Sequence, residues 1–242
     1  MRNILLIMLK ETKTYFLSPM AYIVGAMFLG LTWLFFNTSI VPGDLNPITE
    51  ANVRGYLDPT TLLFIIFAPL ITMRLFSEEE KLGTLELLFT SPVKDIEIVI
   101  GKYFASAIIL ITLLLCTLFY VILIYLFSSP DLGPLLSAYL GIMLYGIATL
   151  GVGLFASSLS GNQIVSAVVG TVLLLLLSFI DSLGAMLEGL PSTVFNEMAL
   201  NYHFEDFTKG VIDIGNIIYY LSLIHISEPT RRTPISYAVF CL

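Results

Sequence analysis

Five apolar runs constrain this chain more than any other feature of its sequence. They cover residues 20–36, 57–73, 103–127, 135–159 and 164–183. Each has about the 17 to 25 residues that a helix needs to cross a hydrocarbon core. Hydrophobic residues make up 57% of the chain and charged residues only 12%, about half the charged fraction of a soluble domain. The sequence therefore predicts an all-α membrane protein with these five runs as spans.

The distribution of lysine and arginine predicts the orientation of the spans. With a cytoplasmic N-terminus, the cytoplasmic segments carry Arg2, Lys10, Lys13, Arg74, Lys81, Lys94 and Lys102, and the external segments carry Arg54 and Lys209. This bias agrees with the rule that positive residues stay on the cytoplasmic side.

The net charge of −7 argues against nucleic acid as a partner, because a protein that binds nucleic acid needs a basic surface for the phosphates.

The stretch before the first span has one apolar side and is interrupted by charges from Lys10 onward. The apolar side holds Ile4, Leu5, Met8 and Leu9. This pattern favours an N-terminal helix that lies in the membrane interface. A signal peptide that starts at Arg2 is the alternative, but its apolar region is short and no small-residue cleavage site follows.

The most charged stretch, "FSEEEKLGTLELLFTSPVKD", spans residues 76–95 between the second and third runs. Apolar residues recur at helical spacing after Glu78–Glu80, whose carboxylates favour a helix N-terminus. Ser91 and Pro92 would end that helix. The pattern predicts a short amphipathic helix on the cytoplasmic side. Such a helix either lies on the membrane surface or docks on a soluble partner, and the residues alone leave both interpretations open.

Longer motifs resemble a known family. The sequence "MRLFSEEEKLGTLELLFTSPVKDIEIVIGKY", residues 73–103, resembles the signature of ABC-2 type transporter permeases, in particular the gliding-motility-associated and multi-copper-maturation subgroup. "SSLSGNQIVSAVVG" at 157–170 and "YHFEDFTKGVIDIGNIIYYLSLI" at 202–224 are similar to later parts of the same family. The resemblance implies an ABC-2 transmembrane domain of six helices over residues 1–224, with the sixth starting at 217.

The resemblance also implies a role for the charged stretch as a coupling helix that docks on a separate ATP-binding subunit. By position, the contact residues are Glu79, Glu80, Gly83, Thr84, Leu85, Glu86 and Pro92. Asn162 and Gln163 would form a second cytoplasmic contact. The family further implies a second permease half, identical or related, and a multi-pass location in the bacterial inner membrane.

The chain itself carries no motif for catalysis or cofactor binding. The sequence G-x-x-x-x-G-K-[ST], which cradles a nucleotide triphosphate, is absent, so the partner subunit would have to bind ATP. The spacing of His and Cys predicts no metal site. His203 is expected to be a solvated histidine beside Glu205 and Asp206 in an external loop. We therefore expect a transport subunit that is not an enzyme and has no cofactor of its own.

The composition of the fourth and fifth spans also predicts how they pack, and the last apolar run predicts an incomplete sixth span. Small residues in 135–159, including Gly146 and Gly153, predict a central span, and the leucine-rich run 164–183 would face lipid along one side. For the external segment after it, the family resemblance implies short helices that partly close the outer face, and the residues are equally compatible with a surface loop on the headgroups. The run "IIYYLSLI" from 217 covers only about 12 Å at 1.5 Å per residue. Residues 225–242 resemble translated sequencing adapter, so the native sequence is expected to end near Ile224.

The predicted function is the permease subunit of an ATP-binding cassette exporter with an unidentified substrate. Two alternatives belong to other classes. An ATPase-independent secondary transporter or channel would need ionisable residues or broken helices within the membrane, and neither pattern is clear in the sequence. A non-transporting membrane anchor could use the same amphipathic helix to recruit a soluble partner.

Overall fold

A computed structural model describes residues 2–40, 51–81, 83, 95–127, 131–184 and 190–226 of the chain. Every regular element in these ranges is a helix. The helices are α1 (Arg2–Leu17), α2 (Pro19–Ile40), α3 (Ala51–Thr72), α4 (Arg74–Lys81), α6 (Asp95–Phe127), α7 (Leu132–Ser157), α8 (Gln163–Gly184), α9 (Leu190–Met198), α10 (Leu200–Thr208) and α11 (Ile214–Ile226). The prediction of an all-α fold is confirmed.

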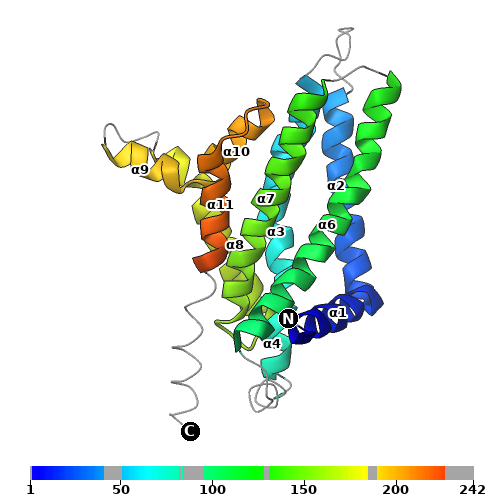
Figure 1. Ribbon diagram of the computed structural model, residues 1–242, viewed down its shortest axis with the longest axis vertical. Helices are drawn as coiled ribbons and strands as arrows, with labels where there is room; N and C mark the ends of the chain where they lie inside the picture. The colour runs from blue at the N-terminus through cyan, green and yellow to red at the C-terminus, as the bar shows by residue number, and fades with distance from the viewer. Residues whose placement is uncertain are drawn as a thin grey trace.

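Five of these helices are long and apolar enough to cross a membrane, and they run side by side as one bundle (Figure 1). They are α2, α3, α6, α7 and α8, which match the five predicted spans. The shorter apolar helix α11 lies beside them, as expected of the start of a sixth. The largest difference is in α6, which begins at Asp95 rather than at 103, so the third span carries an extra polar segment at one end.

Helix α7 is the centre of the bundle, as its small residues predicted. It packs against α3, α6, α8, α10 and α11. A Cβ atom at Gly146 would lie 2.6 Å from Leu110 of α6 and 3.0 Å from Phe64 of α3. These distances are too short for a side chain, so glycine at this position lets α7 approach both neighbours closely.

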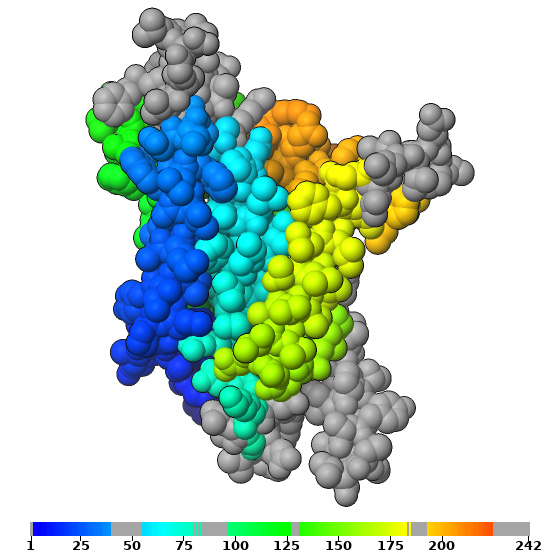
Figure 2. Space-filling view, turned by 180° about the vertical axis from the view of Figure 1, so that it is seen from behind, coloured from blue at the N-terminus to red at the C-terminus, as the bar shows by residue number. Residues whose placement is uncertain are grey.

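Two spans lie at the surface of the bundle. In the space-filling view, α2 and α8 flank α3 on one face (Figure 2). The exposed side of α8 is a stripe of apolar residues at helical spacing, formed by Ile164, Val168, Val172, Leu176 and Phe179. This confirms that one side of α8 is left uncovered by the chain, as suits a helix that faces lipid.

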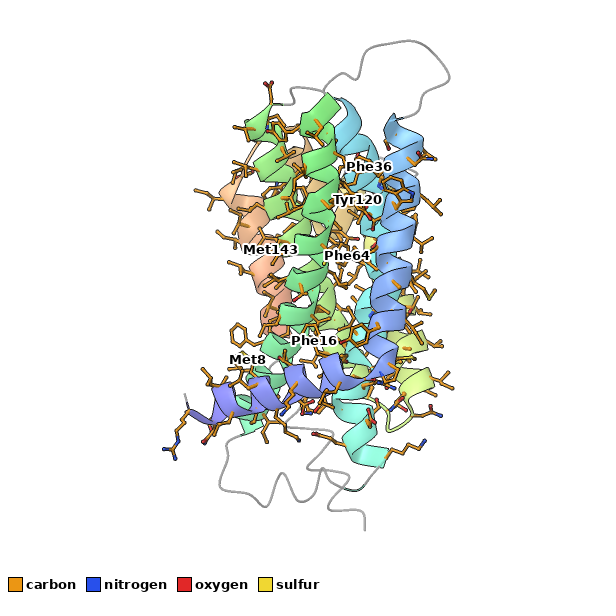
Figure 3. All side chains as sticks on the ribbon, turned by 90° about the vertical axis from the view of Figure 1, so that its right-hand side faces the viewer. Met8, Phe16, Phe36, Phe64, Tyr120 and Met143 are labelled. Atoms are coloured by element: carbon orange, nitrogen blue, oxygen red, sulfur yellow. The ribbon has the colours of Figure 1, made fainter. Side chains whose placement is uncertain are left out.

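The two ends of the bundle carry the shorter helices. Helix α1 lies across one end, close to α4, whereas Phe36 and Tyr120 mark the region towards the opposite end (Figure 3). We call these the α4 end and the α10 end. Helix α10 is fixed to α7 at its end, because Ser137 Oγ donates a 2.8 Å hydrogen bond to the Phe207 carbonyl. The expectation of short helices after the fifth span is met by α9 and α10.

Candidate functional site

The turn between α3 and α4 is stabilised by hydrogen bonds to Ser157 of α7. The turn at Met73 follows Pro69, whose carbonyl accepts a 2.8 Å hydrogen bond from the Met73 amide. Ser157, the last residue of α7, donates from Oγ to the Met73 carbonyl at 3.1 Å and accepts from the Phe76 amide at 3.3 Å. The backbone groups that the turn leaves without helical partners are thereby satisfied, and α4 begins in a defined position.

A group of buried hydroxyls holds one side of α4. The Ser77 and Ser166 hydroxyls form a 2.7 Å hydrogen bond in which either can be the donor. The other hydroxyl can then donate to a carbonyl, Ser77 to that of Ser157 at 3.2 Å or Ser166 to that of Ser160 at 3.0 Å. Ser77, Ser157 and Ser166 are all buried, and we call them the serine cluster. It connects α4 to α7, to α8 and to the turn between them.

A buried lysine holds another side of α4. The Lys102 ammonium lies 2.8 Å from Glu79 Oε1 and 3.1 Å from Glu11 Oε1, and it donates to the Leu75 carbonyl at 2.6 Å. The Phe76 ring lies 5.1 Å from the same ammonium. The Lys102 side chain is only 1% exposed. We call Lys102, Glu11, Glu79 and the Leu75 carbonyl the lysine node, which joins α1, α4 and α6.

The lysine node satisfies the full donor capacity of the ammonium. A lysine ammonium has three N–H donors and no acceptor, and here three oxygen atoms surround it. Removing a charge from water is costly unless it is paired and hydrogen-bonded. The node therefore explains how a lysine can lie inside the bundle, one turn or more within a long apolar helix.

Helix α1 is packed tightly on the first part of α6. A Cβ atom at Gly101 would lie 2.9 Å from the Ile7 side chain and 3.2 Å from the Ile4 carbonyl. Asn3 Nδ2 also donates to Glu97 Oε2 at 3.1 Å. The other side of α1 exposes the large apolar residues Leu5, Leu6 and Leu9. The helix thus has one side fixed to the protein and one apolar side free for the membrane interface.

Arg74 fixes the corner between α1 and α2. Its Nη1 donates to Ser18 Oγ at 2.9 Å, in the break between these two helices. Arg74 and Tyr15 also line a narrow crevice whose other walls are apolar, among them Leu70 and Ile109. Burial raises the pKa of Tyr15 well above its ordinary value, and the nearby Arg74 opposes this shift only in part. Tyr15 is therefore a neutral hydroxyl at physiological pH.

The structure places the three glutamates Glu78–Glu80 in the second half of α4, which ends at Lys81. The amphipathic helix that they were expected to begin lies outside the described residues. Helix α4 starts before the glutamates because Leu75 and Phe76 are buried in the core and follow directly on the turn at Met73. Glu79 turns its carboxylate to Lys102 inside the protein. The function of Glu79 and Glu80 as contacts for another subunit stays a prediction.

Gly83 follows the end of α4 and requires glycine for its conformation. Its φ is +68°, a left-handed conformation that side chains with a Cβ disfavour. Such a glycine commonly ends a helix. The other predicted contacts Thr84, Leu85, Glu86 and Pro92, like the amphipathic helix that they would form, lie outside the described residues, as does the side chain of Glu80.

The second predicted contact lies in the turn before α8. Asn162 is exposed and accepts a 3.0 Å hydrogen bond from the Ile164 amide through Oδ1. It therefore caps the N-terminus of α8, and Gln163 is the first residue of that helix. The same turn contains Ser160, which is bonded to the serine cluster. Asn162 and Gln163 thus lie at the same end of the bundle as α4.

His203 is buried, so its assignment as a solvated histidine was wrong. It lies in α10, with Nδ1 at 2.7 Å from Asn216 Oδ1 and Nε2 at 3.0 Å from the Glu197 carbonyl. Asn216 also donates to Asp206 Oδ2 at 2.9 Å, and the Tyr219 ring stacks on the imidazole at 3.9 Å. We call this group the histidine node. It joins α9, α10 and α11. The sequence had suggested a solvent-exposed histidine because the acidic residues Glu205 and Asp206 follow it closely.

Sequence reasoning also missed the lysine node. Lys102 had been counted only as one of the positive residues that set the orientation. A signal was present in its neighbourhood, because Lys102 stands among apolar and small residues directly before the predicted span 103–127. A lysine in that position needs an acidic partner. Its partners could not be named from the sequence, since Glu11 lies 91 positions away.

Comparison with known proteins identifies the class of this bundle. The family profile described as "ABC-2 family transporter protein" matches residues 44–224. The match covers most of the chain, and the protein therefore belongs to the ABC-2 transporter family. Together with its five long apolar helices, this makes it a multi-pass membrane protein.

Particular relatives are known from Escherichia coli. The chain is 27% identical over 176 residues to the probable multidrug ABC transporter permease YbhR of strain K12, and equally to that of O157:H7. The aligned region covers 71% of this chain and 47% of the relative, so the chain spans about half the length of the curated relatives it matches. Neither description mentions gliding motility or copper maturation, and that subgroup remains a prediction from the motifs.

Proposed function

We propose that this protein is the membrane-spanning permease subunit of an ATP-binding cassette exporter. In this proposal it lies in the bacterial inner membrane with its N-terminus in the cytoplasm. A separate subunit binds and hydrolyses ATP, and a second permease half completes the pathway. Membership of the ABC-2 family supports the proposal, as does the relatives' description as ABC transporter permeases.

The observation that carries the proposal is the double attachment of α4. The serine cluster joins it to α7 and α8, and the lysine node joins it to α1 and α6. Residues 82–94, which contain the predicted coupling helix, follow α4 directly and lead into α6. Lys102 and Glu79 connect the helices on either side of this segment. A subunit that moves the segment would therefore act on packed helices, which shift as rigid bodies.

The proposed mechanism uses this chain only as a mechanical element. ATP-driven closure of the partner subunits would displace the segment 82–94 and change the pathway between the two permease halves. Glu86 is the predicted carboxylate that meets a basic group of the partner. Asn162 and Gln163 are the predicted second contact, beside the same end of α4.

The relatives' description guides the choice of substrate. Because YbhR is described as a probable multidrug permease, we propose hydrophobic drug-like molecules as the first substrate class to test. The motifs that resemble the gliding-motility and multi-copper-maturation subgroup favour a different substrate class. Drug-stimulated ATP hydrolysis by the purified complex would favour the first assignment.

Purification of the full-length gene product in nanodiscs tests whether an ATP-binding subunit is its partner. We expect an ATP-binding cassette subunit to co-purify, identified by mass spectrometry and by vanadate-sensitive ATP hydrolysis. Glu86→Lys is expected to remove this subunit, because it reverses the charge at the predicted contact. Glu205→Lys is the matched control, since it reverses a charge in α10 at the opposite end of the bundle.

The outcomes separate the functional classes. A wild-type protein that folds but recovers no ATP-binding subunit would contradict the exporter and favour a secondary transporter, a channel or an anchor. Retention of the subunit by Glu86→Lys would keep the exporter but remove Glu86 from the contact. An ATP-binding subunit without any drug-stimulated hydrolysis would leave the permease in place and reject the proposed substrate class.

A further inference from the structure

We propose that Lys102 is a positioning residue that makes α1 follow the movement of α4. This inference rests on the proposed function, in which a partner subunit moves the segment after α4. It assigns to α1 an active part in the transport cycle, in addition to any attachment to the membrane interface. The residues involved are those of the lysine node.

The first step of the argument is that the lysine node brings together three elements from distant parts of the chain. Lys102 belongs to α6, its partner Glu11 lies 91 positions earlier in α1, and the Leu75 carbonyl of α4 lies 27 positions earlier. The carboxylates of Glu11 and Glu79 meet at one ammonium group, at 3.1 and 2.8 Å. A displacement of α4 therefore acts on α1 through this buried charged contact, beside the hydrogen bond from Arg74 of α4 to Ser18 at the end of α1.

The second step is that this contact cannot be exchanged for water at low cost. The Lys102 side chain is almost fully buried, and each of its three donors has an oxygen acceptor within the chain. If α4 moved while α1 and Lys102 stayed in place, two donors of a buried ammonium would lose their partners, Glu79 Oε1 and the Leu75 carbonyl. If Lys102 followed α4 without α1, the third donor would lose Glu11. Because a buried unpaired charge is strongly unfavourable, the movement of α1 together with α4 is the lower-energy response.

The third step separates this role from the simple attachment of α1. Other contacts also hold α1 on the bundle: Ile7 packs against Gly101 of α6, Asn3 donates to Glu97 of α6, and α1 packs against α2. Arg74 of α4 also donates to Ser18, the residue that follows α1. These contacts do not involve Lys102. Substitution of Lys102 is therefore expected to leave α1 on the bundle while it removes the buried charged connection between α1 and α4.

Distance measurements between spin labels test the inference. Cys116 and Cys241 are replaced by alanine, and labels are introduced by Leu6→Cys in α1 and Leu136→Cys in α7, both at exposed positions. The complex with its ATP-binding subunit is measured without nucleotide and after vanadate trapping. We expect a nucleotide-dependent change of the distance in the wild type and loss of most of that change in Lys102→Met, with the subunit still bound.

Two variants act as matched controls. Lys102→Arg keeps the charge and is expected to recover a large part of the distance change, although the guanidinium fits the node less well. Lys10→Gln removes a cation that is 68% exposed and lies 3.8 Å from the same Glu11 carboxylate, and it is expected to behave as the wild type. A role of Lys102 in stability alone would not produce a nucleotide-dependent difference between these variants.

The remaining outcomes decide between this inference and the proposed function. If Lys102→Met does not fold, Glu11→Gln replaces it, since it leaves Lys102 paired with Glu79 and is expected to lose the same distance change. A wild-type distance change in the folded variant would overturn the inference. A wild type that binds the subunit but shows no movement of α1 would overturn it too and leave the permease standing. Absence of any ATP-binding subunit in the wild type would overturn both.

Discussion

The two ends of the bundle are held together by different means. At the α4 end, the serine cluster joins α4 to residues 80 to 89 positions away in the sequence, and Lys102 bonds residues 27 and 91 positions away. At the α10 end, the histidine node joins residues that are 6 to 13 positions apart. The first end is therefore a junction of distant helices, and the second is a local cap on α7 and α11.

The difference also concerns charge. The lysine node places one cation between two carboxylates, whereas His203 contacts an amide oxygen and a backbone carbonyl. A buried ion pair adds little stability compared with apolar packing, but it is costly to break. This arrangement suits an end where several helices must keep their relative positions when one of them is displaced. A local cap has no such requirement.

The largest effect is expected for Lys102→Met. Two carboxylates would lose their shared cation inside the bundle, and removal of one partner of a buried pair costs about 3 kcal/mol or more. Thermal unfolding of the purified protein in detergent measures this loss. Lys10→Gln is the control, because its ammonium is largely exposed. A loss no larger than that of the control would show that the lysine node contributes no more than a surface pair.

His203→Leu is expected to cost less and to act locally. The Asn216 and Glu197 oxygens would lose their partner, at about 2 kcal/mol for buried polar groups without a hydrogen bond. Hydrogen exchange should rise in α9, α10 and α11 and remain unchanged in α1 and α4. Tyr202→Phe, at an exposed neighbouring position, serves as the control. Faster exchange in α4 as well would show that the two ends are energetically linked.

Gly83→Ala tests the left-handed backbone conformation that follows the end of α4. The left-handed conformation of Gly83 costs an alanine about 1 kcal/mol, so a small loss of stability is expected. Gly133→Ala is the matched control, because Gly133 lies in α7 with open space around its Cβ position. There alanine is expected to be neutral or to stabilise the helix by a few tenths of a kcal/mol. Equal effects of the two substitutions would mean that the conformation at position 83 is not maintained.

The fold could be predicted further than the site, and the reason is physical. Apolar runs long enough for a membrane identify α2, α3, α6, α7 and α8 without knowledge of their neighbours. The small residues of α7 indicated its central position in the same way, because close helix packing in lipid selects them. Both signals are local in the sequence, and both predictions were confirmed.

The site depends on pairs that no local signal identifies. Lys102 could be recognised as unusual, but its partners Glu11 and Glu79 are brought to it only by the packing of α1 and α4. The helix α4, which begins at Arg74 after the turn at Met73 and contains Glu78–Glu80, had no signal of its own in the sequence. His203 had acidic neighbours in the sequence, and its burial follows from α11 packing beside it.

The smallest effect is expected for Glu205→Gln, and it separates burial from charge as the source of the difference between the two ends. Glu205 pairs with Lys209 at 2.8 Å, but both side chains are about half exposed or more. An exposed pair four residues apart on a helix contributes less than about 0.5 kcal/mol and is screened by salt. Thermal unfolding at low and high salt should therefore scarcely change with this substitution, whereas the loss in Lys102→Met should persist at high salt because the node is buried. If salt reduced both effects equally, the lysine node would behave as a surface pair, and it would provide no fixed connection between α1 and α4.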